Sequence, residues 1–156
     1  MINPEIRCRL VAQEVKTHDT NQFYAATPPV ETLKLILSFA AEDPNLQVSL
    51  VDISRAYFNA EAEREVYVEL PPEAGYGRDS VGVLLKRMYG TRDAAQGWES
   101  TYATAVQDMG FDRGQANPCL FQNADWGIRL CVHGGVSSQR LIPAIWTVRA
   151  AHPPAA

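Results

Sequence analysis

One aspartate stands where a carboxylate could do chemistry. The apolar run "QVSLV" ends at Asp52, a small turn follows, and Tyr57 and Phe58 come directly after it. A carboxylate at a strand tip suits a divalent cation, because Mg²⁺ is commonly held by one or two carboxylates together with substrate phosphates. The spacing alone leaves a second interpretation open, in which Asp52 only caps the turn through its side chain.

The other reactive residue types lack partners at useful spacing. The three histidines form no triad or metal set, the serines have no GxSxG context, and the sequence has no P-loop and no GxGxxG motif. Cys8, Cys119 and Cys131 lie far apart, without metal-ligand spacing. We interpret them as reduced, small apolar side chains of an intracellular protein, in the cytoplasm or nucleus.

Composition predicts one folded domain. A chain of 156 residues that is 46% hydrophobic and 21% charged can bury a core. A net charge of -4 argues against a free-standing nucleic-acid binder, which usually shows a basic face. It leaves open an enzyme with a local basic groove. No apolar run approaches the roughly 20 residues of a membrane span, so we expect no membrane partner. The sequence leaves the oligomeric state open.

The elements that must position Asp52 follow from periodicity and turn signals. Strand patterns occupy five stretches, the last of them a hairpin joined by "NADWG": 5–15, 46–52, 64–72, 81–90 and 119–135. A helix is predicted over 27–43 with Thr27 as its cap and Val30, Leu33, Leu37 and Ala41 as its apolar stripe.

The longest helix candidate covers 91–110 and stops at Gly110. Strands and helices mix without a regular βαβ rhythm, which favours the α+β class.

Six segments of this sequence, in order and with natural spacing, resemble the copia-type retrotransposon reverse transcriptases. They are "RCRLVAQEV", "FYAATPPVETLKLILSFAA", "VSLVDISRAYFNAEAEREVYVELPPE", "LLKRMYGTRDAAQGWE", "MGFDRGQANPCLF" and "LCVHG". The resemblance implies the partial fingers and palm of a right-handed polymerase. It also implies an RNA-directed DNA polymerase that uses Mg²⁺, a template-primer of RNA or DNA, and deoxynucleotide triphosphates.

The resemblance assigns roles to two residues of the Asp52 segment. Asp52 matches the first catalytic aspartate, which would ligate both Mg²⁺ ions of a two-metal site. Tyr57 matches an aromatic position under the sugar of the incoming nucleotide, where a flat ring would exclude a 2′-hydroxyl. Without the resemblance, Tyr57 is equally well interpreted as a core aromatic.

Four further residues match nucleotide-binding positions. Arg7 and Arg9 match a basic strand of the fingers that contacts the triphosphate, to which a guanidinium fork is suited. A solvated strand face remains the alternative for both. Gly90 would permit close backbone approach, and Arg92 would meet a phosphate. The family usually has a glutamine near Asp93, so contacts there are less well defined.

The pattern breaks where the family carries two adjacent aspartates in a hairpin turn. His133 and Gly134 fall on the first two positions of that box, and Gly135 and Val136 stand where the aspartates belong. Neither of these side chains can ligate Mg²⁺. We therefore expect the site to be incomplete and the chain to be inactive by itself.

The break divides the chain into a partial reverse transcriptase at 1–135 and an unrelated, disordered tail at 136–156. Two other functions stay open. One is a non-catalytic remnant that grips nucleic acid electrostatically. The other is a degenerate product without function, whose exposed sheet edge invites aggregation.

Overall fold

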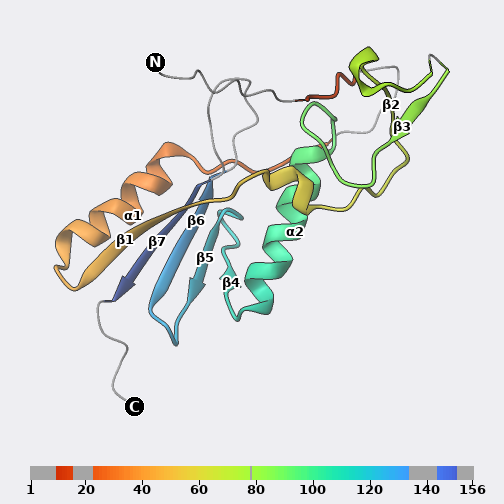
Figure 1. Ribbon diagram of the computed structural model, residues 1–156. Helices are drawn as coiled ribbons and strands as arrows, with labels where there is room; N and C mark the ends of the chain where they lie inside the picture. Colours follow the sequence, from red (N-terminus) through yellow and green to blue (C-terminus); the bar gives the residue numbers. More distant parts are fainter. Residues whose placement is uncertain (1–9, 16–22, 78, 134–143, 151–156) are drawn as a thin grey trace, which may run out of the picture.

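The computed structural model describes residues 10–15, 23–77, 79–133 and 144–150 (Figure 1). An antiparallel sheet forms its centre, and its five strands follow in the order β1 (Leu46–Asp52), β7 (Ala144–Ala150), β6 (Ile128–His133), β5 (Leu120–Asn123) and β4 (Asp112–Arg113). A separate antiparallel pair consists of β2 (Tyr67–Glu69) and β3 (Val81–Val83). The helical elements are α1 (Val30–Glu42), α2 (Ala94–Asp108) and the short 3₁₀ turns η1 (Ala56–Asn59) and η2 (Pro72–Ala74). This mixture confirms the predicted α+β class.

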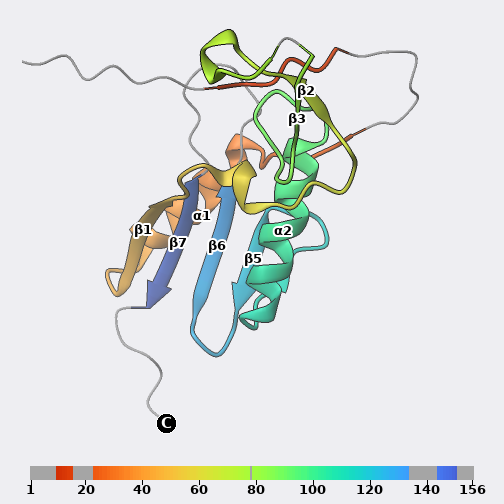
Figure 2. The same ribbon diagram turned by 45° about the vertical axis from the view of Figure 1, so that its right-hand side comes forward.

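The two long helices pack on opposite faces of the sheet (Figure 2). Side chains alternate along β6, so Leu130 and Val132 point to the α2 face while Cys131 packs against Ile36 of α1. Both faces of this central strand are therefore buried.

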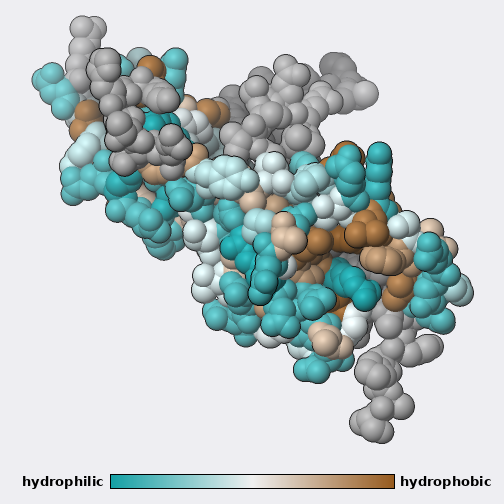
Figure 3. All heavy atoms as spheres, turned by 180° about the vertical axis from the view of Figure 1, so that it is seen from behind, coloured by the Kyte–Doolittle hydropathy of each residue, from teal (hydrophilic) through white to brown (hydrophobic). Residues whose placement is uncertain are grey.

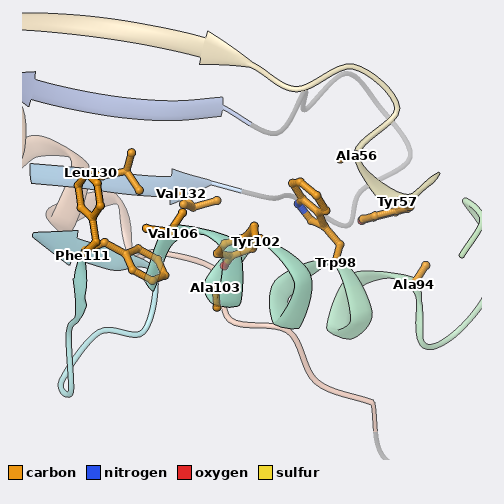
Figure 4. Packing of buried hydrophobic residues seen from close by; sticks show 11 residues of the cluster. Ala56, Tyr57, Ala94, Trp98, Tyr102, Ala103, Val106, Phe111, Leu130 and Val132 are labelled. Atoms are coloured by element: carbon orange, nitrogen blue, oxygen red, sulfur yellow. The ribbon is translucent and has the colours of Figure 1, made fainter. Parts of the chain in front are cut away.

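Helix α2 supplies the largest share of the core, five of the eleven buried residues in the main cluster. Trp98, Tyr102 and Val106 recur every four residues, which places them on one face of the helix. Figure 4 shows this row pointing toward Val132 on one side and toward Tyr57 on the other. The helix covers 94–108 of the predicted 91–110, and the predicted stop, Gly110, follows its C-cap with a φ of +83° that glycine readily adopts. In the part of the chain that the structure describes, no helix has the length and apolar character to cross a membrane.

Two predicted strands are shorter than expected, since only 67–69 of 64–72 and 81–83 of 81–90 are strands. Three other predicted elements differ from the structure. Residues 10–15 form no strand, because the segment that they contact, residues 89–90, turns away at Gly90 after two backbone hydrogen bonds. Residues 5–9 of the predicted strand lie outside the described residues. Helix α1 begins after Pro29 rather than at Thr27, since a residue that precedes proline is pushed out of helical conformation. Its buried residue is Ile36, and the predicted stripe positions at Val30 and Leu37 are exposed.

The third difference concerns the tail. Residues 144–150, predicted to be disordered, form β7 between β1 and β6. The physical reason is that β7 gives hydrogen-bond partners to the facing edges of both neighbours. The remainder of the predicted tail, at 136–143 and 151–156, lies outside the described residues.

The two described thiols are buried deeply enough to be unreactive. Burial raises the pKa of Cys119 and of Cys131 to about 11, and the charge of Glu99 adds to the effect at Cys119. At pH 8 only about a thousandth of each would be thiolate, the nucleophilic form. We expect a Cys8→Ser variant to show no fast reaction with an aromatic disulfide reagent at pH 8 until it is unfolded, when two thiols should react. Fast labelling of the native variant would contradict this burial.

Candidate active site

Asp52 ends β1 and is exposed to solvent. In the sheet register Asp52 lies opposite Ala144, and Ala144 lies opposite His133 on its other side. Asp52 and the end of β6 are thus at the same end of the sheet, one strand apart (Figure 1). With neighbouring strands about 4.8 Å apart, their Cα atoms are separated by roughly 10 Å.

Alternation also places these two residues on one face. Leu46 and Cys131 belong to the cluster around Ile36, on the α1 side of the sheet. Asp52 is six residues after Leu46 and His133 is two after Cys131, so both fall on that same side. The box positions that follow His133 lie outside the described residues.

The turn after Asp52 contains a strained residue. Arg55 has φ 55° and ψ 42°, a left-handed conformation, and it precedes η1. Such a conformation costs a non-glycine residue roughly 1–2 kcal/mol. The strain is offset by the turn that it creates, which brings Ala56 and Tyr57 into the core.

Tyr57 is packed among aromatic rings. Its ring lies 4.6 Å from that of Tyr89 between centroids, and Phe58 meets Tyr89 edge-on at 5.9 Å. Burial raises the pKa of the Tyr57 hydroxyl above its ordinary value. This geometry agrees with the core interpretation of Tyr57, while its role under a sugar stays a prediction.

Gly90 does permit a close backbone approach, and the chain's own N-terminal segment makes it. Gly90 has φ +92°, and a Cβ atom there would lie 1.7 Å from the Ala12 carbonyl oxygen. Arg92 follows two residues later, with its guanidinium carbon 5.2 Å from the centre of the Phe23 ring. Arg7 and Arg9 lie outside the described residues, so the predicted phosphate contacts of all four residues stay predictions.

The described residues do not by themselves fit a Mg²⁺ site. Across residues 10–15, 23–77, 79–133 and 144–150, no group of three or more His, Cys, Asp or Glu side chains is placed to hold a metal ion. Asp52 offers one carboxylate, whereas Mg²⁺ at such sites needs further oxygen ligands. We therefore derive no metal-dependent step from this arrangement.

A cluster of charged residues beside α2 was missed by sequence reasoning. We call Glu14, Arg64, Arg87 and Asp93 the ion-pair cluster. Asp93 is 5% exposed and accepts hydrogen bonds from Arg87 Nη1 at 2.5 Å and from Arg64 Nη2 at 2.9 Å. Arg64 also binds Glu14 with both terminal nitrogens, at 2.9 and 2.7 Å. The cluster borders a cleft of about 300 Å³.

Gly97 makes room for this cluster inside a helix. A Cβ atom there would lie 1.8 Å from Arg87 Nε, so only glycine lets the guanidinium lie against α2. The sequence offered one signal for this arrangement, a helix-weakening glycine in the middle of a long helix pattern. Arg87 and Asp93 are six positions apart, but Arg64 is 50 positions from Glu14 and 29 from Asp93, too distant for any local signal.

The fold and site together define an α+β domain with an exposed carboxylate at the end of a strand of its sheet. A family model for the reverse transcriptase (RNA-dependent DNA polymerase) matches residues 2–137. The chain therefore belongs to the reverse transcriptase family.

Relatives from budding yeast agree with this assignment. Over 129 residues, covering 81% of this chain, it is 29% identical to the transposon Ty1-DR4 and TyH3 Gag-Pol polyproteins and 28% identical to that of Ty1-MR1, all from Saccharomyces cerevisiae. The matched region is 7–8% of these polyproteins, so the chain spans under a tenth of their length. The predicted resemblance to copia-type reverse transcriptases is confirmed. No solved structure shows a significant match.

Proposed function

We propose that this chain is a reverse transcriptase domain of a copia-type element, with the scaffold of fingers and palm but without a complete catalytic centre. The observation that carries this proposal is the row from Asp52 across β7 to His133. A hairpin box that follows His133 would be separated from Asp52 by one strand, where paired carboxylates could bind the same metal ions as Asp52. This sequence has Gly135 and Val136 at those two positions.

In this proposal the domain binds deoxynucleotide triphosphates and a template-primer without joining them. Asp52 alone leaves most of the ligand sites of a two-metal centre unsupplied, and phosphoryl transfer depends on positioning and charge stabilisation by that centre. Nucleotide binding would rest on arginines, whose planar forks match phosphate oxygens.

Primer extension tests the proposal directly. We expect no product on an RNA template, with Mg²⁺ or Mn²⁺, from the wild-type chain or from Asp52→Asn, with both shown to be folded by circular dichroism. Equilibrium titration should still detect binding of dTTP to both proteins. Primer extension by the wild type that disappears in Asp52→Asn would mean that other residues complete the catalytic centre. The proposal that the chain is inactive would then be wrong.

One observation, the exposed edge of β1, favours the alternative in which this chain is a degenerate product without function. Val48 and Leu50 are 43% and 59% exposed on a strand that, within the described part of the chain, pairs along one edge only. Seen from behind, apolar residues gather over the side of the molecule that α1 and the sheet form (Figure 3). Long apolar edge strands promote association between chains. A monomeric sample with a cooperative thermal transition would count against this alternative.

A further inference from the structure

The N-terminal segment lies directly against the loop that leads into α2. The Ala12 amide donates to the Tyr89 carbonyl at 2.8 Å, and the Glu14 amide donates to the Gly90 carbonyl at 3.3 Å. These segments are separated by more than seventy positions in the sequence. Two backbone hydrogen bonds between partly exposed segments make a weak joint, so side chains must help to hold it.

The Glu14 carboxylate provides that help by binding two other parts of the chain. It accepts hydrogen bonds from both terminal nitrogens of Arg64, in the bidentate geometry that makes arginine–carboxylate pairs strong. Its Oε2 atom also accepts the Arg92 amide at 2.7 Å. The hydrogen bonds from Arg64 lower the pKa of Glu14 below its ordinary value, so the group is charged at neutral pH.

The Arg64 end of this contact is itself anchored. Arg64 is bound to the buried Asp93, at the start of α2. The guanidinium carbons of Arg64 and Arg92 lie 5.3 and 5.2 Å from the centre of the Phe23 ring, a distance at which cation–π attraction acts. The direction of the Arg92 side chain therefore depends on a ring that it shares with Arg64.

We propose that Glu14 is a positioning residue, which fastens the N-terminal segment to residues 89–92 and so fixes Arg92 at the entrance to α2. The inference rests on the proposed function, in which Arg92 meets a phosphate of the nucleotide. Glu14 touches no substrate; it acts through the Arg92 amide and through Arg64. Without the carboxylate, that amide loses its acceptor and the segment separates from the loop.

Two variants disturb the joint in different ways. Glu14→Gln keeps the size of the side chain but removes its charge. Gly90→Ala keeps every charge but places a methyl group where the Ala12 carbonyl oxygen lies. Glu69→Gln is the matched control, since Glu69 is exposed on β2 and its side chain is outside the ion-pair cluster.

The readouts are amide hydrogen exchange by NMR and equilibrium binding of dTTP with Mg²⁺. In both variants we expect exchange at the Ala12 and Glu14 amides to become at least about tenfold faster, the effect of losing one charge-assisted hydrogen bond. Exchange at Tyr102 and Val106, in the α2 core, should stay unchanged. The dissociation constant for dTTP should rise about tenfold in both variants, and Glu69→Gln should match the wild type.

The two variants also separate position from charge. Removing a carboxylate could by itself strengthen triphosphate binding, because like charges repel. Gly90→Ala has no such effect, so weaker dTTP binding with faster exchange in both variants supports a positioning role.

Unchanged exchange at Ala12 and Glu14 in Glu14→Gln would overturn the inference, and so would faster exchange with unaltered dTTP affinity. A wild-type chain that binds no dTTP would instead overturn the proposed nucleotide site.

Discussion

The Asp93→Ala variant is expected to lose about 3–5 kcal/mol of unfolding free energy, measured by urea denaturation. The reason is that Asp93 is 5% exposed and binds two guanidiniums, Arg87 at 2.5 Å and Arg64 at 2.9 Å. Arg87 is equally buried, so removing the carboxylate leaves an under-compensated positive charge in the interior. Glu63 at the surface compensates only in part, since its side chain is 79% exposed.

The control for this prediction is Asp108→Ala, an exposed aspartate in the last turn of α2. Because Asp108 is exposed, this change should alter stability by no more than about 0.5 kcal/mol. A negative charge at a helix C-terminus is unfavourable, so its removal does not add to a loss of stability. Equal losses in the two variants would contradict a special role for Asp93.

The contribution of Asp93 should also depend on pH. Burial raises the pKa of Asp93, but the hydrogen bond and charge of Arg64 and the charge of Arg87 outweigh burial and hold the pKa below its ordinary value. A depressed pKa stabilises the fold above the unfolded-state pKa of about 3.9, and that stabilisation is lost as the pH falls through the lower folded-state value. The difference in stability between wild type and Asp93→Asn should therefore be constant from about pH 5 to 8 and shrink below about pH 4. A stability difference that grew on acidification would show that the pKa of Asp93 is raised by folding and not lowered.

Phe121→Ala is expected to cost about 3–5 kcal/mol, the range for removing a buried aromatic ring. Phe121 is 2% exposed and packs between the sheet and α2. Its ring meets Tyr102 edge-on at 6.1 Å between centroids, and the Arg113 guanidinium carbon lies 5.7 Å from its centre. Alanine would leave a cavity that this paired arrangement cannot readily collapse, and thermal or urea unfolding would measure the loss.

Phe58→Ala is the matched variant, because Phe58 is 37% exposed and, among the described residues, its ring contacts only one other aromatic ring, that of Tyr89. Partial exposure means that less apolar surface returns to water, so the loss should be well under half of that at Phe121. A larger loss of stability in Phe58→Ala than in Phe121→Ala would show that the core is centred at η1 and not at the α2 face of the sheet.

Much of the fold could be predicted because its signals are local. The run that ends at Asp52, the helix that ends just before Gly110 and the hairpin across residues 123–128 each show their periodicity or turn residues within a few positions. The family could be recognised for a related reason, since its six segments keep their order and spacing along the chain. The missing carboxylates at Gly135 and Val136 are likewise a property of the sequence alone.

The sequence by itself thus determined most of the elements, the family and the composition of the site. Tertiary structure decided which distant residues meet. The close approach expected at Gly90 is made by Ala12, Asp93 is bound by Arg64 from 29 positions away, and residues 144–150 enter the sheet beside β1. These pairings could not be predicted, because a buried charge or an open strand edge must be satisfied by some partner, and only the packed chain shows which partner is within reach.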